Sequence, residues 1–252
     1  MKLFLKISYL GTAYSGYQAQ KNGISIQQRL NEATKKLFGF DCDVCGCSRT
    51  DKGVHANEFC LTVCEHGKNY LKTAVPVDNI VKAMNVYLPY DIAVFAAEWR
   101  DEDFHARYSV VAKEYIYRIH NSSVRSPFED GRALQYDRVL DDEAIERMRL
   151  AAKFLEGKHD FSSFMASGSK ITKCERTILN TDIVKNGDLI VLSVRADGFL
   201  YNMVRIIVGT LLEVAEKKLE PEDILEIIKI KDRKAAGRTA PPQGLYLNKV
   251  FY

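Results

Sequence analysis

Residues 41–64 read DCDVCGCSRTDKGVHANEFCLTVC and consist of two apolar segments on either side of a polar loop. The segments at about 41–47 and 58–64 are short and rich in valine, phenylalanine and cysteine, which predicts two β-strands. The loop between them carries four side chains of catalytic type: Arg49, Asp51, Lys52 and His55. Loops held by a rigid scaffold commonly carry catalytic groups. An Asx-turn at Asp51 beside Gly53 is the structural alternative, and the loop alone leaves both open.

Strand and helix patterns alternate along the rest of the chain, which predicts an α+β fold. Residues 2–9 alternate as a strand, and Ser25 begins a helix with the capping pattern S-x-x-Q. The other predicted elements are helices at 76–87, after Asp141, at 201–217 and after Pro221, and strands at 91–99, 108–120, 172–184, 188–197 and 244–252. An acidic stretch at 100–103 is the predicted seam between an N-terminal half, 1–103, and a C-terminal half, 104–252.

Composition restricts the class of protein. The chain has 252 residues, 36 Lys and Arg against 33 Asp and Glu, and is 46% hydrophobic, so it is predicted to be globular and not disordered. The apolar run at 202–215 contains Arg205 and Glu213 and is shorter than the ~20 residues of a membrane span. The N-terminus lacks the uninterrupted apolar core of a signal peptide. These features predict a cytoplasmic protein whose six cysteines are reduced.

The cysteines could be structural or could bind a metal. Cys42, Cys45 and Cys47 lie close together in the sequence, with Cys60 and Cys64 nearby. In a strand, Cys45 and Cys47 share one face and Cys42 points to the other, which is unfavourable for a zinc site. Cysteine in an apolar strand behaves as a small hydrophobic residue. Structural thiols are therefore favoured, while three histidines keep the metal alternative open: His55, His66 and His105.

Two further features indicate a polar site. Arg205 projects from the edge of the apolar face of the helix at 201–217 and needs an anionic partner, because an unpaired buried charge is costly. No acid on that helix faces it, and Asp51 is the predicted partner. On the strand at 108–120, Tyr115 and Tyr117 share one face. A tyrosine ring at a pocket edge can stack on a nucleic-acid base, although cross-strand packing explains the pair equally well.

These residues lie within a set of motifs that resembles the tRNA pseudouridine synthase A family. The motifs cover nearly the whole chain in order: YLGTAYSGYQAQ (9–20), CSRTDKGVHA (47–56), FHARYSVVAKEYIYRI (104–119), DFSSFMA (160–166), FLYNMVRIIVGTLLEV (199–214) and GLYLNKVFY (244–252). Leu10 and Tyr17 stand where the family commonly has Asp and Trp. Ser48 and Lys52 replace the Gly and Ala usual in bacterial members.

The resemblance implies two similar α/β halves, ferredoxin-like or RRM-like. They would join into one extended, mostly antiparallel sheet with helices on one face and an active-site cleft between the halves. It implies isomerisation of uridine to pseudouridine at nucleotides 38, 39 and 40 of the tRNA anticodon stem-loop, by a homodimer without cofactor or metal. Asp51 aligns with the catalytic aspartate and Arg205 with its arginine partner. Tyr115 aligns with the tyrosine that stacks on the target base, and Leu245 with a pocket residue. Further RNA contacts are expected from Arg49, Gln18, Lys113 and Arg107.

Three alternatives remain open at this stage. A synthase of the same fold acting on other tRNA positions is the nearest. A non-catalytic tRNA-binding protein would not need Asp51 and would use basic residues instead: Arg49, Lys113, Arg118 and the cluster Lys170, Lys173 and Arg176. A zinc-dependent RNA-modifying enzyme would use Cys42, Cys45 and Cys47 and would contain stoichiometric metal.

Overall fold

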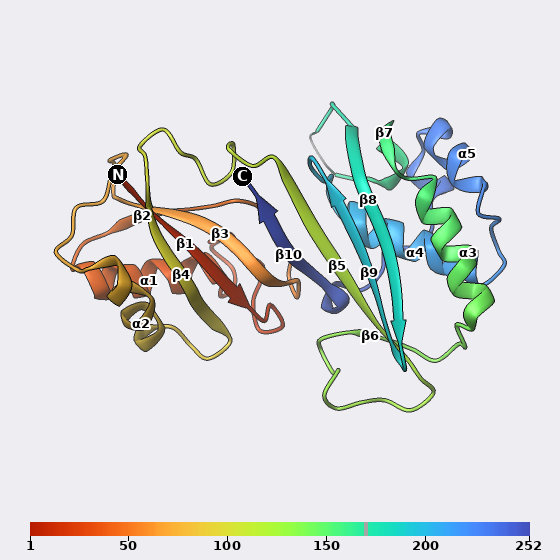
Figure 1. Cartoon of the computed structure of the whole chain (residues 1–252), viewed down its shortest axis with the longest axis horizontal. Coiled ribbons are helices and arrows are strands. Elements are labelled where there is room, and N and C mark those ends of the chain that lie inside the picture. Colours follow the sequence, from red (N-terminus) through yellow and green to blue (C-terminus); the bar gives the residue numbers. More distant parts are fainter. Residues whose placement is uncertain (169–170) are drawn as a thin grey trace. The chain divides into compact units, whose positions relative to one another are not determined.

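The computed structural model describes residues 1–168 and 171–252, so Lys170 of the predicted basic cluster lies outside the described residues. The chain forms two compact units, and Figure 1 identifies their elements. The first unit comprises Met1–Val111 and Tyr246–Tyr252, and the second comprises Ala112–Leu245. The final strand therefore belongs almost entirely to the first unit, as do residues 104–111. Within the described residues the secondary structure comprises ten strands and five α-helices, an α+β protein with mostly antiparallel strand pairing.

The first unit has the strand order β4-β1-β3-β10, with β2 also paired to β3. The pairings are antiparallel except that of β10 with β3, which aligns Tyr246 with His55. Because β2 pairs with the far end of β3, the chain between them returns to the start of β3 as a loop at 47–54. The strands are β1 (Lys2–Tyr9), β2 (Cys42–Gly46), β3 (His55–Glu65), β4 (Ile92–Arg100) and β10 (Leu245–Phe251), and the helices are α1 (Ile26–Phe38) and α2 (Val77–Tyr87).

The second unit has the strand order β5-β9-β8-β7, with the short strand β6 parallel to β5. Helix α3 packs on α4 and β8, and α4 also contacts β5. The strands are β5 (Ala112–Asn121), β6 (Leu134–Tyr136), β7 (Gly157–Asp160), β8 (Glu175–Asn186) and β9 (Leu189–Ala196). The helices are α3 (Asp142–Lys153), α4 (Met203–Ala215), α5 (Asp223–Ile230) and the 3-10 turns η1 (Ser162–Phe164), η2 (Arg233–Ala235) and η3 (Pro242–Gly244).

Local sequence signals account for several boundaries. The Ser25 hydroxyl accepts a hydrogen bond from the backbone N–H of Gln28 at 3.2 Å, which confirms the predicted start of α1. Gly39 ends that helix in the left-handed conformation, with φ 81°. The Asp141 carboxylate accepts from Ala144 N–H at 2.8 Å and caps α3 in the same way. Gly187, with φ 57°, provides the predicted tight turn between β8 and β9.

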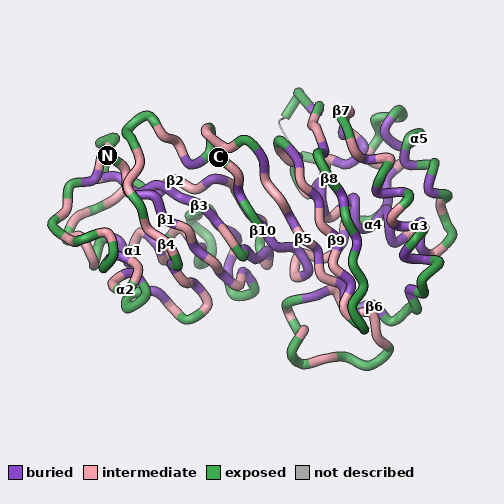
Figure 2. The backbone as a smooth tube through the Cα atoms, in the orientation of Figure 1, coloured by how far each residue is buried: buried purple, intermediate pink, exposed green. Residues whose placement is uncertain are grey.

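Each unit has its own apolar core, and Figure 2 shows the buried segments along its strands and helices. Helix α4 is buried on nearly all sides, since Arg205 and Glu213 are the two residues between Met203 and Ala215 that are not buried. The sequence predicted only a buried stripe on this helix. Within the part of the chain that the structure describes, no helix is long and apolar enough to cross a membrane.

The structure corrects several predicted boundaries. Strand β8 runs from Glu175 to Asn186, not over 172–184. Strand β3 starts at His55, which the sequence placed in the polar loop; its side chain is fully buried. Strand β5 starts at Ala112, four residues later than predicted, because residues 104–111 form turns that belong to the first unit. Strands β6 and β7 were not predicted, since segments of three and four residues are too short to show an alternating pattern.

Candidate active site

Asp51 lies in a tight turn on the loop at 47–54. Its carbonyl oxygen accepts a hydrogen bond from the Val54 N–H at 3.1 Å, and Gly53 occupies the turn with φ 79°. Glycine suits this position because a positive φ is costly for residues with a Cβ. The Asp51 side chain is half-buried, whereas the side chains of Arg49 and Lys52 are exposed. The turn therefore presents a carboxylate at the surface of the first unit with a guanidinium two residues away.

Thr50 fixes this turn to the rest of the first unit. Its hydroxyl is 2.8 Å from the hydroxyl of Tyr9, at the end of β1, and both groups are buried. Its carbonyl oxygen accepts the Tyr17 N–H at 3.1 Å. Buried polar groups that are satisfied in this way hold one backbone conformation, because breaking a contact leaves an unpaired group. The residue next to Asp51 is thus held from two directions.

Two glycines of the segment at 9–20 allow it to lie directly against the loop. A Cβ on Gly11 would lie only 1.9 Å from the Val54 carbonyl oxygen. A Cβ on Gly16, which has φ 98°, would lie 2.6 Å from the Thr50 carbonyl oxygen. The Gly11 N–H also donates to Nδ1 of the buried His55 at 2.9 Å. Two motifs that are separate in the sequence therefore form one structure around Asp51, and His55 has a structural role in it.

Tyr17 anchors the same segment. Its ring stacks on Phe59 with centroids 4.2 Å apart, and Gly46 leaves room for it, because a Cβ there would lie 2.6 Å from the ring. Burial raises the pKa of the Tyr17 phenol well above its usual range, so it stays protonated. Its hydroxyl has no hydrogen-bond partner among the described residues. The next residue, Gln18, is exposed, and the Tyr17–Thr50 contact places it near the loop that carries Arg49.

In the second unit, Arg205 is held by neighbouring oxygen atoms. Its Nε donates to the Ala240 carbonyl at 2.7 Å, and its Nη1 donates to Oδ1 of Asn202 at 2.8 Å. The Ala240 N–H in turn donates to the Arg205 carbonyl at 3.0 Å. These contacts fix the plane of the guanidinium, which is the property that distinguishes arginine from lysine at a carboxylate-binding position.

The segment at 237–241 reaches Arg205 because it runs directly along α4. A Cβ on Gly209 would lie 1.7 Å from the Arg238 carbonyl oxygen, so only glycine permits this approach. The Thr210 hydroxyl accepts the Gly237 N–H at 3.0 Å. Arg238 N–H donates to the Glu213 carboxylate at 3.2 Å. The position of the Ala240 carbonyl is therefore determined by the helix that carries Arg205.

The same segment connects Arg205 with the strand of the predicted base-stacking residue. Tyr117 donates from its hydroxyl to the Pro241 carbonyl at 2.8 Å, next to the carbonyl that accepts from Arg205. Burial raises the pKa of Tyr117 far above its usual range and keeps it a donor. Tyr115, two residues earlier on the same face of β5, is buried edge-to-face against Phe199, with centroids 5.0 Å apart. Leu245, three residues after Pro242, is also buried.

The predicted residues thus form two groups. Asp51, Arg49 and Gln18 lie together in the first unit, and Tyr115, Arg205 and Leu245 lie on connected elements of the second. Lys113 precedes Tyr115 by two residues on β5 and is half-buried. Arg107 is exposed on the turn after β4, where its guanidinium is 5.8 Å from the Tyr108 ring.

The cysteines show the properties of structural thiols. Among residues 1–168 and 171–252, no three His, Cys, Asp or Glu side chains are grouped closely enough to hold a metal ion. Cys45 lies 3.8 Å from Nε2 of His105 as an isolated pair. Burial raises the pKa of the Cys42 thiol to about 11, which disfavours the thiolate that binds metals. The zinc alternative has no ligand set in the described residues.

Three contacts that build the candidate site were not predicted from the sequence: those of Asn202, Thr50 and the Ala240 carbonyl. Asn202 directly precedes α4 and has φ 59°, a conformation in which asparagine is enriched. An asparagine directly before a helix with an arginine at the edge of its buried face could have indicated the Asn202–Arg205 contact from the sequence. The other two contributions depend on contacts between residues far apart in the sequence.

Comparison with known proteins gives full-length relatives. The model of a family described as "tRNA pseudouridine synthase" matches residues 151–252. "tRNA pseudouridine synthase A" of a Thermoanaerobacter species is 43% identical over 250 residues, covering 99% of each chain. The protein of the same name from Clostridium acetobutylicum is 41% identical and covers 98% of each chain. That from Ruminiclostridium cellulolyticum is also 41% identical, over 100% of this chain and 99% of the relative.

Proposed function

Because this chain belongs to the tRNA pseudouridine synthase A family, we propose that it isomerises uridine to pseudouridine at positions 38, 39 and 40 of the tRNA anticodon stem-loop. The reaction breaks the N1–C1′ glycosidic bond and forms a C5–C1′ bond. The proton lost from C5 is balanced by one gained at N1, so no electrons and no groups enter or leave. One positioned carboxylate can serve this chemistry, as a nucleophile or as a general base.

The observation that carries the proposal is the rigid placement of Asp51. The turn that holds it is fixed through Thr50 to Tyr9 and Tyr17, and Gly11 and Gly16 allow the supporting segment to approach. A protein that only bound RNA would need basic residues in this loop but no fixed carboxylate, which would repel phosphate. A half-buried carboxylate on a backbone turn that is held in one conformation is suited to catalysis, because the turn positions the reacting group.

We assign the other roles as follows. Arg205 pairs with Asp51 during catalysis and keeps the carboxylate ionised. The support for this role is the fixed plane of its guanidinium, held by Asn202 and the Ala240 carbonyl. The target uridine leaves the helical stack, and the Tyr115 ring holds it beside Leu245. Arg49, Gln18, Lys113 and Arg107 contact the RNA.

The proposal includes the arrangement implied by the family. The two units join into one sheet with the catalytic cleft between them, and two copies of the chain act as a homodimer on one tRNA in the cytoplasm. Light scattering on the purified protein, alone and with tRNA, tests the dimer. A monomer in both conditions would contradict that part and leave the chemistry intact.

The decisive experiment is a pseudouridine map of an in vitro transcribed tRNA after incubation with the protein, without added metal or nucleotide. Wild-type protein should produce pseudouridine at 38 to 40, and Asp51→Asn should produce none while binding the tRNA as tightly as wild type. Lys52→Ala is the matched control, since it changes the exposed neighbour on the same turn. It should retain turnover.

The other outcomes separate the alternatives. Pseudouridine at other positions would keep the enzyme class and move the target. Binding without modification over a panel of tRNAs would favour the non-catalytic protein. Residual turnover by Asp51→Asn would remove Asp51 from the chemistry.

A further inference from the structure

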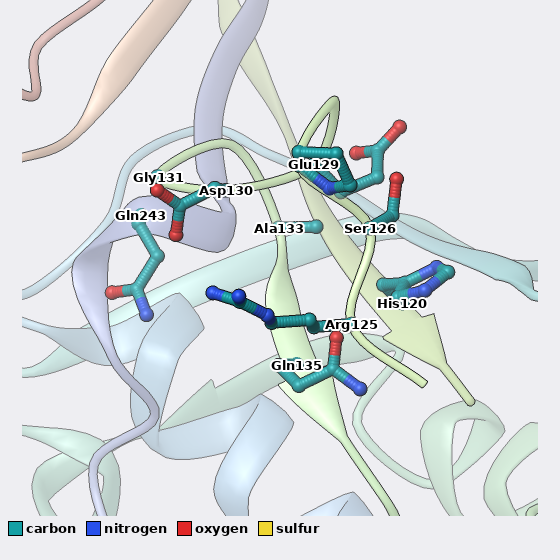
Figure 3. Close-up of a pocket in the computed structure, with 10 residues that line it drawn as sticks. His120, Arg125, Ser126, Glu129, Asp130, Gly131, Ala133, Gln135 and Gln243 are labelled. Carbon is teal, nitrogen blue, oxygen red and sulfur yellow. The ribbon is translucent and has the colours of Figure 1, made fainter. Parts of the chain in front are cut away.

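The second unit contains a cavity that none of the proposed catalytic residues lines. Its volume is about 200 Å³, and it lies beside the ends of β5 and β6, under the loop at 122–133 and against Gln243 of η3 (Figure 3). The side chains that matter for its chemistry are those of Arg125, Asp130, Gln135 and Gln243. The cavity is smaller than the ~300 Å³ at which pockets for whole small molecules begin. It is suited to a compact polar group.

Arg125 supplies the positive charge of this cavity. Its side chain is exposed, and Figure 3 shows it extending across the cavity toward Gln243. Within residues 1–168 and 171–252, no carboxylate forms an ion pair with it. The nearby Glu129 does not cancel its charge, because both carboxylate oxygens of Glu129 accept from Arg118, at 2.9 and 2.8 Å. A guanidinium left in this state is suited to bind a phosphate.

Asp130 supplies an acceptor on another wall of the same cavity. It is exposed, and in the described chain it has neither an ion pair nor a hydrogen bond through its carboxylate. A carboxylate opposes a second phosphate but binds hydroxyl groups well, and ribose hydroxyls are common partners of acidic side chains. The combination of one cation and one carboxylate in a single small cavity therefore matches a phosphate joined to a ribose.

An aromatic ring on the same loop completes the recognition. The Phe128 side chain is 81% exposed, and Val124, also on this loop, is 71% exposed. Exposed aromatic rings next to arginine are typical of surfaces on which unpaired bases stack. Because the cavity has room for the phosphate and ribose but not for a base as well, the base would lie outside it, against Phe128.

The cavity is at a suitable distance from the base-stacking residue. His120, which lines it, is five residues after Tyr115 on β5. At ~3.3 Å per residue the two positions are about 17 Å apart, which spans roughly five nucleotides of a stacked strand at ~3.4 Å each. We propose that this cavity binds the phosphate and ribose of an unpaired anticodon-loop nucleotide, with Arg125 on the phosphate and Asp130 on the ribose 2′-hydroxyl. The proposal rests on the function proposed above.

The test uses the full-length protein and an anticodon stem-loop RNA. Arg125→Ala should raise the Kd about tenfold and reduce the slope of log Kd against log salt by about one, with the loss of activity appearing in KM. Arg132→Ala, an exposed arginine on the same loop that does not line the cavity, is the matched control and should change the Kd less than about twofold.

Single 2′-deoxy substitutions through the loop of the same RNA test the ribose contact. One substituted nucleotide should weaken binding to wild type several-fold and leave binding to Asp130→Ala unchanged. Equal effects on both proteins, or wild-type affinity for Arg125→Ala, would overturn the proposal. These are binding measurements, so they remain informative if the wild-type protein fails to make pseudouridine, which would instead refute the proposed function.

Discussion

Asn202 accepts a hydrogen bond from the guanidinium of Arg205 at 2.8 Å, and its own backbone is left-handed, with φ 59°. The residue therefore combines a conformation at the start of α4 with a contact that orients the arginine. Replacement by glycine removes the side-chain contact but keeps the backbone conformation, because glycine adopts positive φ without strain. We expect Asn202→Gly to reduce kcat at least tenfold while the free energy of unfolding changes by less than about 1 kcal/mol. Single-turnover pseudouridine formation and urea denaturation measure the two quantities.

Asn202→Asp is the matched control, since it keeps the acceptor oxygen and tolerates the same backbone conformation. It should retain more activity than the glycine variant. If Asn202→Gly turns over at the wild-type rate, Asn202 has no positioning role in catalysis.

The contact between the Tyr9 and Thr50 hydroxyls gives a second prediction. Both groups are buried and 2.8 Å apart, and Thr50 directly precedes Asp51. Tyr9→Phe removes one partner and should lower the free energy of unfolding by about 1–2 kcal/mol, because the Thr50 hydroxyl stays buried without it. Since the Asp51 turn then gains freedom, kcat should fall with little change in KM for tRNA.

Tyr14→Phe distinguishes the turn from the segment as a whole. The Tyr14 hydroxyl donates to Asp91 at 2.6 Å, a residue outside the loop at 47–54. This variant should lose stability to a similar extent and keep the wild-type kcat. Equal losses of kcat in both variants would mean that the effect comes from general destabilisation.

Loss of the Tyr17 hydroxyl should raise the free energy of unfolding, whereas loss of the Tyr9 hydroxyl should lower it. Its ring is buried against Phe59, while its hydroxyl has no partner in the described chain, so the polar group is buried at a cost. Tyr17→Phe keeps the stacked ring and removes the hydroxyl. We expect the free energy of unfolding to rise by about 1 kcal/mol, with unchanged turnover. A loss of more than about 1 kcal/mol in urea denaturation would show that the hydroxyl is satisfied by ordered water.

Local signals in the sequence predicted the elements well where a boundary depends on a nearby residue. Ser25 and Asp141 cap helices as expected, and Gly187 provides the hairpin turn. The prediction was wrong at His55, because its imidazole is paired with the Gly11 N–H, far away in the sequence, and can therefore be buried at the start of β3. A polar residue in a polar stretch gives no local sign of such a partner.

In the candidate site, too, the sequence predicted residues with local signals and missed a contact between residues far apart in the chain. The sequence identified Asp51 and Arg205 as unusual, the first by its loop and the second by its place on an apolar helix. It gave no indication of the Ala240 carbonyl oxygen that accepts from Arg205, because Ala240 is 35 residues away and contributes only its backbone. The pairing of Asp51 with Arg205 stays a prediction, and the kinetics of the variants above test its consequences.

Asp160 gives a prediction for pH dependence. Partial burial disfavours its charged form, but hydrogen bonds from Ser162 and an ion pair with Lys231 at 2.9 Å outweigh this and lower the pKa of Asp160. Its pKa is therefore lower in the folded than in the unfolded state, where it is about 3.9. The stabilisation is fully present above the unfolded pKa and is lost as the pH falls through the folded pKa. Asp160→Asn should thus lower the free energy of unfolding by about 1 kcal/mol near pH 7, and the difference from wild type should shrink below about pH 4.

Urea denaturation at both pH values measures this difference, with Asp103→Asn as an exposed control that should match wild type at each pH. A difference that persists at low pH would mean that the asparagine disrupts the turn at η1 and that the carboxylate charge is not the cause.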